Sequence, residues 1–317
     1  MWQKADCTFV MSKENGFALP LVLGITTILV VIVISISTSV SRKINLITEL
    51  DSRTHAEMKT YSAFNEVVFN MSISMFTSTD MVFVPVATPD VTVPMGMESG
   101  ITLWNLFGVP IPLKDGVTVT MRDAAGMISL FSDPQLMERF LSCYTTNTEQ
   151  IAKIVDSLAD WRDQDDFKHI NGAEALDYRM AGYRYGPRNA YLQSVDEFNL
   201  VMGMTPELFD RICPEMIYWA SGNINYLTMS ESLLRAALQD DKMTDQILQL
   251  RRNRQLTGSL FSAITGLQET ESNIFMPPGF FHLEISAQVE QATDRIQAIV
   301  SKKGSRNSPF TITEWVR

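Results

Sequence analysis

The densest group of side chains that could do chemistry is an acidic segment near the middle of the chain. Between Asp156 and Asp177 there are seven acidic residues against two basic ones, a local charge of −5. The acids are Asp156, Asp160, Asp163, Asp165, Asp166, Glu174 and Asp177. Crowded carboxylates raise one another's pKa unless solvent or a cation relieves the repulsion. A divalent cation with oxygen ligands, most naturally Ca²⁺, would relieve it.

The spacing of these acids does not by itself select a cation site. Asp163 and Asp165 lack the third acid and the glycine that an EF-hand loop places at fixed offsets. A solvated acidic loop is therefore the interpretation that the residues alone favour. Trp161, between two of the acids, is expected to be a core anchor at a helix end.

Nucleophilic and metal-binding patterns based on cysteine or histidine are absent from the sequence. Cys143 and Cys213 could form a disulfide in an oxidising compartment, and the sequence leaves their pairing open. Neither cysteine lies in a CxxC or Cys/His pattern, which argues against zinc. The histidines, His55, His169 and His282, have no nucleophile beside them in a known motif and are expected at the surface. We therefore expect no enzymatic activity.

The element that must position everything else is an N-terminal apolar segment. Residues Phe17 to Val40 form a stretch of 24 residues without a charge. As a helix it would be about 36 Å long, enough to cross a bilayer core of about 30 Å. Apolar residues then recur at helical spacing among polar ones as far as Met71. This predicts one long helix whose outer half packs on the folded part.

Strand patterns lie on both sides of a helical block. Apolar and polar residues alternate over 117–121 and over 281–290, and Phe310 and Ile312 repeat the pattern. Helix starts are predicted between them near Asn147, Ser194, Thr205 and Thr228. The predicted fold class is α+β: a long N-terminal helix packed on an antiparallel sheet, with a large all-helical domain inserted between strands.

The overall charge argues against nucleic acid as a partner. The net charge is −10 and the pI about 4.9, whereas phosphate binding needs clustered Lys and Arg. Arg251, Arg252 and Arg254 form a short basic run, which we interpret as a solvated helix face.

A leader motif precedes the apolar stretch. Lys13 to Leu19 read KENGFAL, which resembles a type III (prepilin) signal. That resemblance implies cleavage between Gly16 and Phe17 by a prepilin peptidase and N-methylation of Phe17. The size of the leader suggests Met11 as an alternative start to Met1. Leu21 stands where most members of that superfamily have Glu.

Four internal segments resemble, in order, the K-type minor pseudopilins of type II secretion systems, the member known for lacking that Glu. They are DAAGMISL at 123–130, LADWRDQD at 158–165 with GAE at 172–174 and Tyr178 following, GMTPEL at 203–208 and NIN at 223–225. The resemblance implies a leader at 1–16, a membrane and spine helix at 17–72, and a pilin-like β domain at 73–125 and 273–317. It also implies a helical insertion at 126–272.

Several functional expectations follow from the resemblance. It implies a subunit at the tip of a pseudopilus in the inner membrane, with its C-terminal domain in the periplasm, that supports export across the outer membrane. The implied partners are I- and J-type minor pseudopilins and prepilin peptidase, with secreted substrates or the outer-membrane channel as further contacts. It also implies structural Ca²⁺, with Asp163, Asp165, Glu174 and Asp177 as ligands and Asp160 as a further one.

One alternative function stays open from the sequence. It is a minor pilin or membrane-anchored DNA-binding component of a type IV pilus or DNA-uptake system. The turn at 203–208 resembles a helix-hairpin-helix element, whereas the acidic composition argues against DNA.

Overall fold

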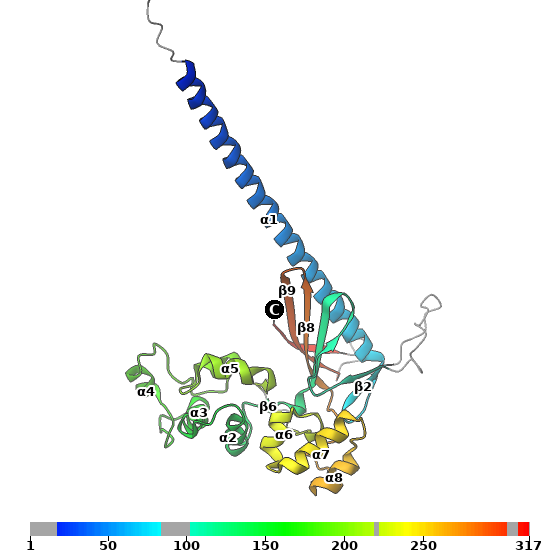
Figure 1. Cartoon of the computed structure of the whole chain (residues 1–317). Coiled ribbons are helices and arrows are strands. Elements are labelled where there is room, and N and C mark those ends of the chain that lie inside the picture. Colours follow the sequence, from blue (N-terminus) through cyan, green and yellow to red (C-terminus); the bar gives the residue numbers. More distant parts are fainter. Residues whose placement is uncertain (1–17, 84–101, 219–221, 303–309, 317) are drawn as a thin grey trace, which may run out of the picture.

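The structure is a computed structural model that describes residues 18–83, 102–218, 222–302 and 310–316. The predicted cleavage point at Gly16 and Phe17 therefore lies outside the described residues. Figure 1 shows one long helix, a sheet packed on its second half, and a block of helices beyond the sheet.

The helix α1 (Ala18–Ile73) has 56 residues and two different halves. Every described side chain from Leu19 to Asp51 is exposed, and this helix is long and apolar enough to cross a membrane. Hydroxyls within the apolar half donate to carbonyls of the preceding turn, as Thr27 does to Leu23 at 2.9 Å. From Ala56 onward one stripe is buried, consisting of Ala56, Thr60, Ala63, Phe64, Val67 and Met71.

Two antiparallel sheets pack near the second half of α1. The smaller one contains β1 (Met75–Phe76), β2 (Asp80–Phe83) and β3 (Thr102–Asn105). The larger has five strands in the order β10-β9-β8-β5-β4. These are β4 (Ile111–Pro112), β5 (Val117–Asp123), β8 (Phe280–Val289), β9 (Ala292–Ser301) and β10 (Thr311–Val316). The strands predicted from alternation are confirmed.

The alternation of β5 and β8 divides the large sheet into an apolar and a polar face. Val119 pairs with Ile285 and Met121 with Leu283, and all four are buried in one core with the stripe on α1. Arg122 pairs with His282, and because successive side chains of a strand point to opposite faces, both lie on the other face of the sheet. The polar face therefore lies toward the inserted helices.

The inserted block has its own core. It contains α2 (Pro134–Ser142), α3 (Thr148–Arg162), α4 (Ala175–Met180), α5 (Pro206–Ile212), α6 (Glu231–Leu238), α7 (Asp241–Arg252) and α8 (Gly258–Thr265). A short parallel pair, β6 (Ile128–Ser129) and β7 (Met216–Ile217), joins them to the sheet region. Large side chains such as Phe140, Tyr178, Phe198 and Phe261 are fully buried in this core.

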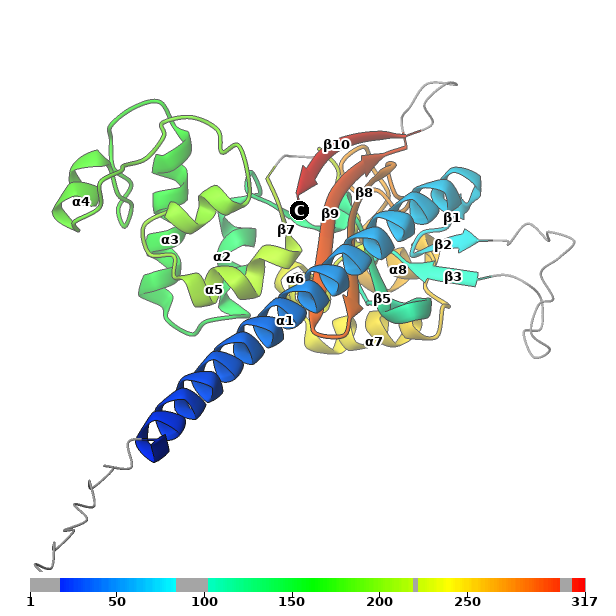
Figure 2. The ribbon, with the colours of Figure 1, turned by 90° about the horizontal axis from the view of Figure 1, so that it is seen from above.

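The insertion lies at the membrane-distal end of the sheet. At the other end, the β8–β9 turn approaches α1, where Ser52 donates a 2.8 Å hydrogen bond to Glu290. The chain leaves β5 at Asp123 and returns into β8 at Phe280, which is the opposite end of the same strands. Figure 1 places the inserted helices away from the apolar half of α1, and Figure 2 shows α1 crossing over β8 and β9.

The predicted helix starts are confirmed at three of four places. Asn147, Thr205 and Ser230 each accept a hydrogen bond from a backbone N–H of the first turn. The helix predicted after Ser194 is wrong, because Asp196–Leu200 forms only a 3-10 turn. Its Glu197 accepts from Gln193 N at 3.0 Å, one residue before the predicted cap, and also from Trp161 Nε1 at 2.9 Å.

The junction between sheet and insertion is a buried carboxylate. Asp123 is fully buried, and it accepts hydrogen bonds from Ala125 N at 3.1 Å, Asn225 Nδ2 at 2.8 Å and Thr228 Oγ1 at 2.9 Å. Burial raises the pKa of Asp123 to about 6. A Cβ on Gly126 would lie 2.4 Å from Thr228 Oγ1, so this turn needs glycine.

One part of the basic run is not solvated as predicted. Arg251 is buried, donates to the carbonyl oxygens of Leu227 and Met229, and lies over the Phe107 ring at 4.3 Å. It holds α7 against the segment before β4. Only Arg252 and Arg254 of the run are exposed.

Candidate cation site and interdomain cavity

The acidic segment begins at the C-terminal end of α3, which the inserted core holds in place. Ile154, Leu158 and Trp161 form the buried face of this helix. Trp161 is 3% exposed, which confirms it as a core anchor. Because helical residues three or four apart share a face, burial of this face fixes Asp160 inside and places Asp163 at the C-cap.

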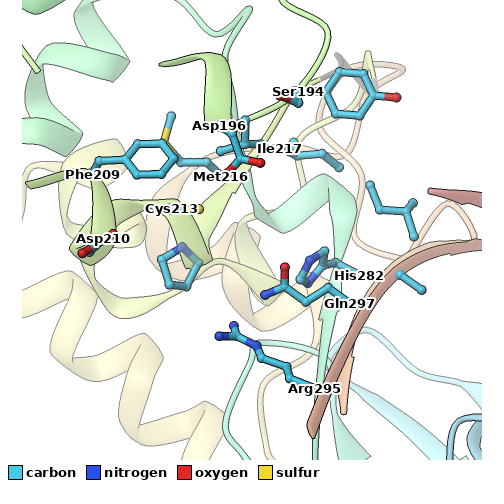
Figure 3. Close-up of a pocket in the computed structure, with 15 residues that line it drawn as sticks. Ser194, Asp196, Phe209, Asp210, Cys213, Met216, Ile217, His282, Arg295 and Gln297 are labelled. Carbon is cyan, nitrogen blue, oxygen red and sulfur yellow. The ribbon is translucent and has the colours of Figure 1, made fainter. Parts of the chain in front are cut away.

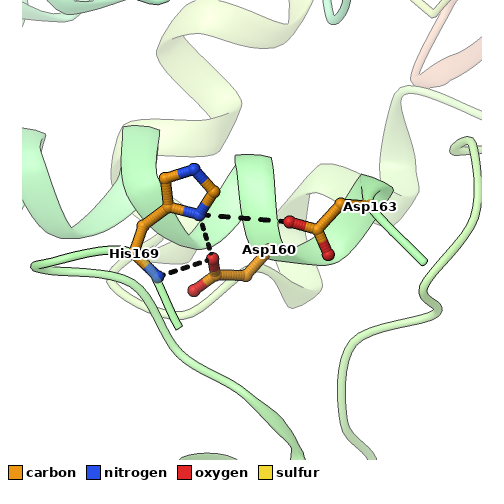
Figure 4. A group of neighbouring side chains, drawn as sticks. All are labelled: Asp160, Asp163 and His169. Carbon is orange, nitrogen blue, oxygen red and sulfur yellow. Dashed lines mark hydrogen bonds and ion pairs between the residues drawn. The ribbon is translucent and has the colours of Figure 1, made fainter. Parts of the chain in front are cut away.

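Asp160, Asp163 and His169 meet at this point. One ligand atom from each lies within 4.8 Å of the others. Asp160 Oδ1 accepts a 3.0 Å hydrogen bond from His169 N and contacts His169 Nδ1, which lies 4.0 Å from Asp163 Oδ2 (Figure 4). The loop comes so close that a Cβ on Gly172 would lie 1.9 Å from Asp160 Oδ2.

Two carboxylate oxygens in this region are buried without a donor. Among the described residues, no hydrogen bond reaches Asp160 Oδ2 or Asp163 Oδ1. The Glu174 carboxylate, by contrast, accepts from the backbone in the first turn of α4. An unsatisfied buried polar group costs about 1–3 kcal/mol, and more if it is charged. These atoms therefore call for water or a cation.

The pKa shifts in the cluster also favour a bound cation. Burial raises the pKa of Glu174 to about 7, with the charges of Asp160 and Asp163 adding to the effect. Burial and the neighbouring acids also raise the pKa of Asp163. The hydrogen bond to Asp160 raises the pKa of His169. The cluster thus holds more negative charge than its described neighbours neutralise.

The remaining predicted ligands are engaged elsewhere. Asp165 Oδ1 accepts a 2.8 Å hydrogen bond from Phe167 N. Asp177 accepts from Glu174 N and from Lys168 Nζ, each at 3.0 Å, and the first of these contacts lowers its pKa. The structure thus brings Asp160 and Asp163 together, with the charge of Glu174 coupled to theirs, while Asp177 fixes the start of α4.

His169 is the member of this cluster that the sequence did not indicate. It is exposed, as expected, but its backbone and ring both contact Asp160. Its spacing to Asp160 matches no known ligand pattern. As a donor set, hard carboxylate oxygens suit a divalent cation such as Ca²⁺, whereas an imidazole is not a usual Ca²⁺ ligand. The residues present fit the predicted cation through their carboxylates.

A second site is a cavity of about 340 Å³ between the polar face of the sheet and the inserted block. Figure 3 shows His282, Arg295 and Gln297 on one wall, and Cys213 with Phe209 on the other. His282, expected at the surface, is half-buried in the wall of this cavity, and desolvation there lowers its pKa to about 4.

The cysteine that lines this cavity is a protonated thiol at neutral pH. Burial raises the pKa of the Cys213 thiol to about 11, so it is not a thiolate nucleophile. Arg295 is paired with Glu284 at 2.6 Å. Cys143 and Cys213 are both free thiols in the structure, and the Cys143 Sγ donates to Arg139 O at 3.5 Å. The disulfide considered from the sequence is not formed in it.

Comparison with known proteins gives one consistent result. A family model described as type II secretion system (T2SS), protein K, matches residues 131–220. A type II secretion system protein K of Klebsiella pneumoniae is 29% identical over 152 residues, covering 45% of this chain and 47% of that protein. One from Aeromonas hydrophila is 22% identical over 214 residues, covering 62% of each.

Two further similarities are to a curated protein and to a solved structure. A protein K of Dickeya chrysanthemi is 30% identical over 125 residues, covering 37% of this chain and 34% of that protein. A chain in the crystal structure of the GspK-GspI-GspJ complex from enterotoxigenic Escherichia coli aligns with a TM-score of 0.47 and 15% identity, over 87% of this chain and 98% of that one. The alignments span less than two thirds of the length of these curated relatives.

Proposed function

We propose that this chain, which is similar to K proteins of type II secretion systems, is a minor pseudopilin at the tip of a pseudopilus and supports protein export across the outer membrane. The observation that carries this proposal is the division of α1 into an exposed apolar half and a half packed on a sheet. Such a helix can leave a bilayer and continue into an assembly without a break.

The outer side of α1 supports assembly with other pseudopilins. Met58, Tyr61, Phe69 and Ile73 form a stripe at helical spacing, opposite the buried one. Tyr61 and Phe69 are 58% and 62% exposed although they lie beyond the apolar half. Exposed apolar stripes mark interaction sites. The proposed partners are the helices of I- and J-type minor pseudopilins.

The position of the insertion supports a place at the tip. The helical block lies at the membrane-distal end of the sheet, where it adds bulk beside the last turn of α1 (Figure 1). Another subunit could not stack there in the same register. At the tip, the inserted helical block would also be the part of the subunit that contacts secreted substrates or the outer-membrane channel. The role is structural, without a catalytic step.

The proposed location is the inner membrane, with residues beyond the span in the periplasm. Prepilin peptidase would cleave between Gly16 and Phe17, and the new N-terminus would be methylated. Within the span, Leu21 is an exposed apolar residue. Because it carries no charge, it needs no oppositely charged group from another subunit inside the bilayer.

The acidic cluster is proposed to hold structural Ca²⁺. Asp160, Asp163 and Glu174 would supply the ligands, with Asp165 close by and Asp177 holding the start of α4. A bound cation would neutralise the cluster and fasten the end of α3 to the loop before α4. The unsatisfied oxygens of Asp160 and Asp163 support this assignment.

The experiment that tests the function is N-terminal sequencing and intact mass of the protein from a host with an active prepilin peptidase. We expect a mature chain that begins at methylated Phe17. A chain that keeps its leader would contradict a pseudopilin role, since subunits enter the pseudopilus only after cleavage in this scheme.

A further inference from the structure

The turn after α4 presents arginine and tyrosine side chains to solvent. Gly182, with φ of 88°, ends the helix, and Tyr183 N donates a 3.0 Å hydrogen bond to Tyr178 O. This backbone pattern is that of a Schellman turn, which fixes the direction of the chain after a helix. Arg179 and Arg184 lie on either side of the turn and are both exposed.

The two tyrosines of this turn are held in place by the core. The Tyr183 and Tyr185 rings lie 5.2 Å apart, and each packs against Tyr178 at 5.9 and 5.8 Å. Tyr178 is fully buried, and its hydroxyl accepts a 2.7 Å hydrogen bond from Met202 N. Tyr183 and Tyr185 nevertheless remain 43% and 38% exposed. They form a rigid, half-exposed aromatic surface.

The positive charges of this surface lack acidic partners. From Tyr178 to Tyr191 the chain has three arginines and no acid, in a protein of net charge −10. Arg188 is paired with Glu197. Within the described parts of the chain, no carboxylate forms an ion pair with Arg179 or Arg184, and the Arg179 Nε donates only to Ala175 O, at 3.2 Å.

The composition and rigidity of this surface are those of a binding hot spot. Tyrosine and arginine dominate the energy of protein interfaces, and rings that are already ordered lose little entropy on binding. Two unpaired guanidinium groups beside such rings can each bind a carboxylate through two hydrogen bonds. The complementary partner is therefore rich in Asp or Glu.

The location of the surface favours a protein over a lipid headgroup. In both views α4 lies at the outer edge of the inserted block (Figures 1 and 2). It is therefore not part of α1, the described helix that is apolar enough to cross a membrane. Half-exposed tyrosine rings beside arginines are typical of protein interfaces, where the rings pack against a peptide backbone that a lipid headgroup lacks.

We propose that Arg179, Tyr183, Arg184 and Tyr185 form a docking surface for an acidic segment of a protein partner. The arginines contact the carboxylates of that segment, and the tyrosine rings pack against its backbone and apolar side chains. This surface is separate from the exposed stripe on α1, and its binding does not depend on cleavage of the leader.

The test is binding of a fluorescein-labelled poly-glutamate peptide to the full chain in neutral detergent with calcium present, measured by fluorescence anisotropy. We expect binding that weakens as salt is added, and no binding of poly-glutamine. The R179E/R184E variant should weaken it about tenfold or more, which corresponds to about 1.4 kcal/mol. Y183A should also weaken it.

The matched control is R252E/R254E, which makes the same change in charge at two exposed arginines on another surface. Equal loss in this control would mean that only net charge matters, and the proposal would fail. It would fail as well if wild type bound poly-glutamate no better than poly-glutamine. If duplex DNA displaced the peptide as effectively as unlabelled poly-glutamate, the surface would be a general anion site and the proposed partner class wrong.

Discussion

The side-chain amide of Asn225 donates a 2.8 Å hydrogen bond to the buried carboxylate of Asp123, across 102 residues of sequence. The contact joins the last residue of β5 to the turn that precedes α6. It is therefore one of the contacts that hold the inserted block on the sheet. The segments DAAGMISL and NIN, separate in the sequence, meet here.

The first prediction is that Asn225→Ala loosens the insertion from the sheet. The substitution leaves Asp123 with one side-chain donor fewer in a buried site and also removes the acceptor for Leu227 N. We expect a loss of about 2 kcal/mol in the free energy of unfolding. Hydrogen exchange should rise in β5 and near Thr228. Asn199→Ala, the same substitution at an exposed position, is the control.

The second prediction concerns pH and the same carboxylate. The pKa of Asp123 is about 6 in the folded chain against 3.8 for the ordinary group, so the folded state holds the proton more tightly. Its contribution to stability is present below about pH 4 and falls as the pH rises toward 6, by up to about 3 kcal/mol. Asp123→Asn should remove this part of the pH dependence.

The measurement is denaturant unfolding of wild type and variant between pH 4 and 7. The difference between the two curves isolates Asp123 from the other titrating groups. Asp115→Asn, at an exposed turn, is the control for the loss of one acid. Parallel curves for wild type and Asp123→Asn would show that the carboxylate titrates at an ordinary pKa.

The third prediction concerns calcium. Excess Ca²⁺ over a chelator control should raise the Tm of the wild-type protein by several degrees, because the ion binds the folded state preferentially. Glu174→Gln and Asp163→Asn should reduce or abolish the rise. Glu207→Gln, an exposed acid on α5, should keep it. A wild-type Tm that is the same with calcium and with chelator would exclude the proposed site.

The fourth prediction concerns the exposed stripe of α1. Tyr61→Glu together with Phe69→Glu should abolish co-purification with I- and J-type minor pseudopilins. Both side chains are exposed, so the stability of the isolated chain should change by less than about 0.5 kcal/mol. Glu57→Gln lies on the same helix and serves as the control. Undiminished co-purification would place the partners elsewhere.

The fifth prediction compares the two cysteines of the folded part. Cys143 is exposed, whereas Cys213 faces the cavity and burial raises its thiol pKa to about 11. Iodoacetamide at pH 8 should therefore modify Cys143 much faster than Cys213, as followed by peptide mass spectrometry without reductant. Protection of both cysteines until reductant is added would indicate a disulfide.

The fold was largely readable from the sequence, because its signals are periodic. Alternation over 281–290 predicted β8, and the caps at Asn147 and Thr205 predicted α3 and α5. Prediction failed where a side chain with a local role was used over a long range. Glu197, which read as half of a capping box, accepts from Gln193 N but also from Trp161 and Arg188, and only a 3-10 turn forms there.

The candidate site was only partly readable for the same reason. The spacing of the acidic residues indicated which segment carries the negative charge, but not which of the carboxylates are buried. Burial of α3 selects Asp160, and the close passage of Gly172 brings His169 to it. The cavity beside His282 arises from packing between distant segments, which no local pattern encodes.

The register of the large sheet has a consequence for how such a chain could arise. Asp123 and Phe281 are directly opposite each other on neighbouring antiparallel strands, so everything between them is, topologically, the loop of one hairpin. The entropy of closing a loop grows only slowly with its length, so a folded domain can occupy that loop at little extra cost. Exchanging residues 124–280 for a tight turn would leave the strand pairing intact. The sheet and spine are thus a scaffold into which a domain can be grafted.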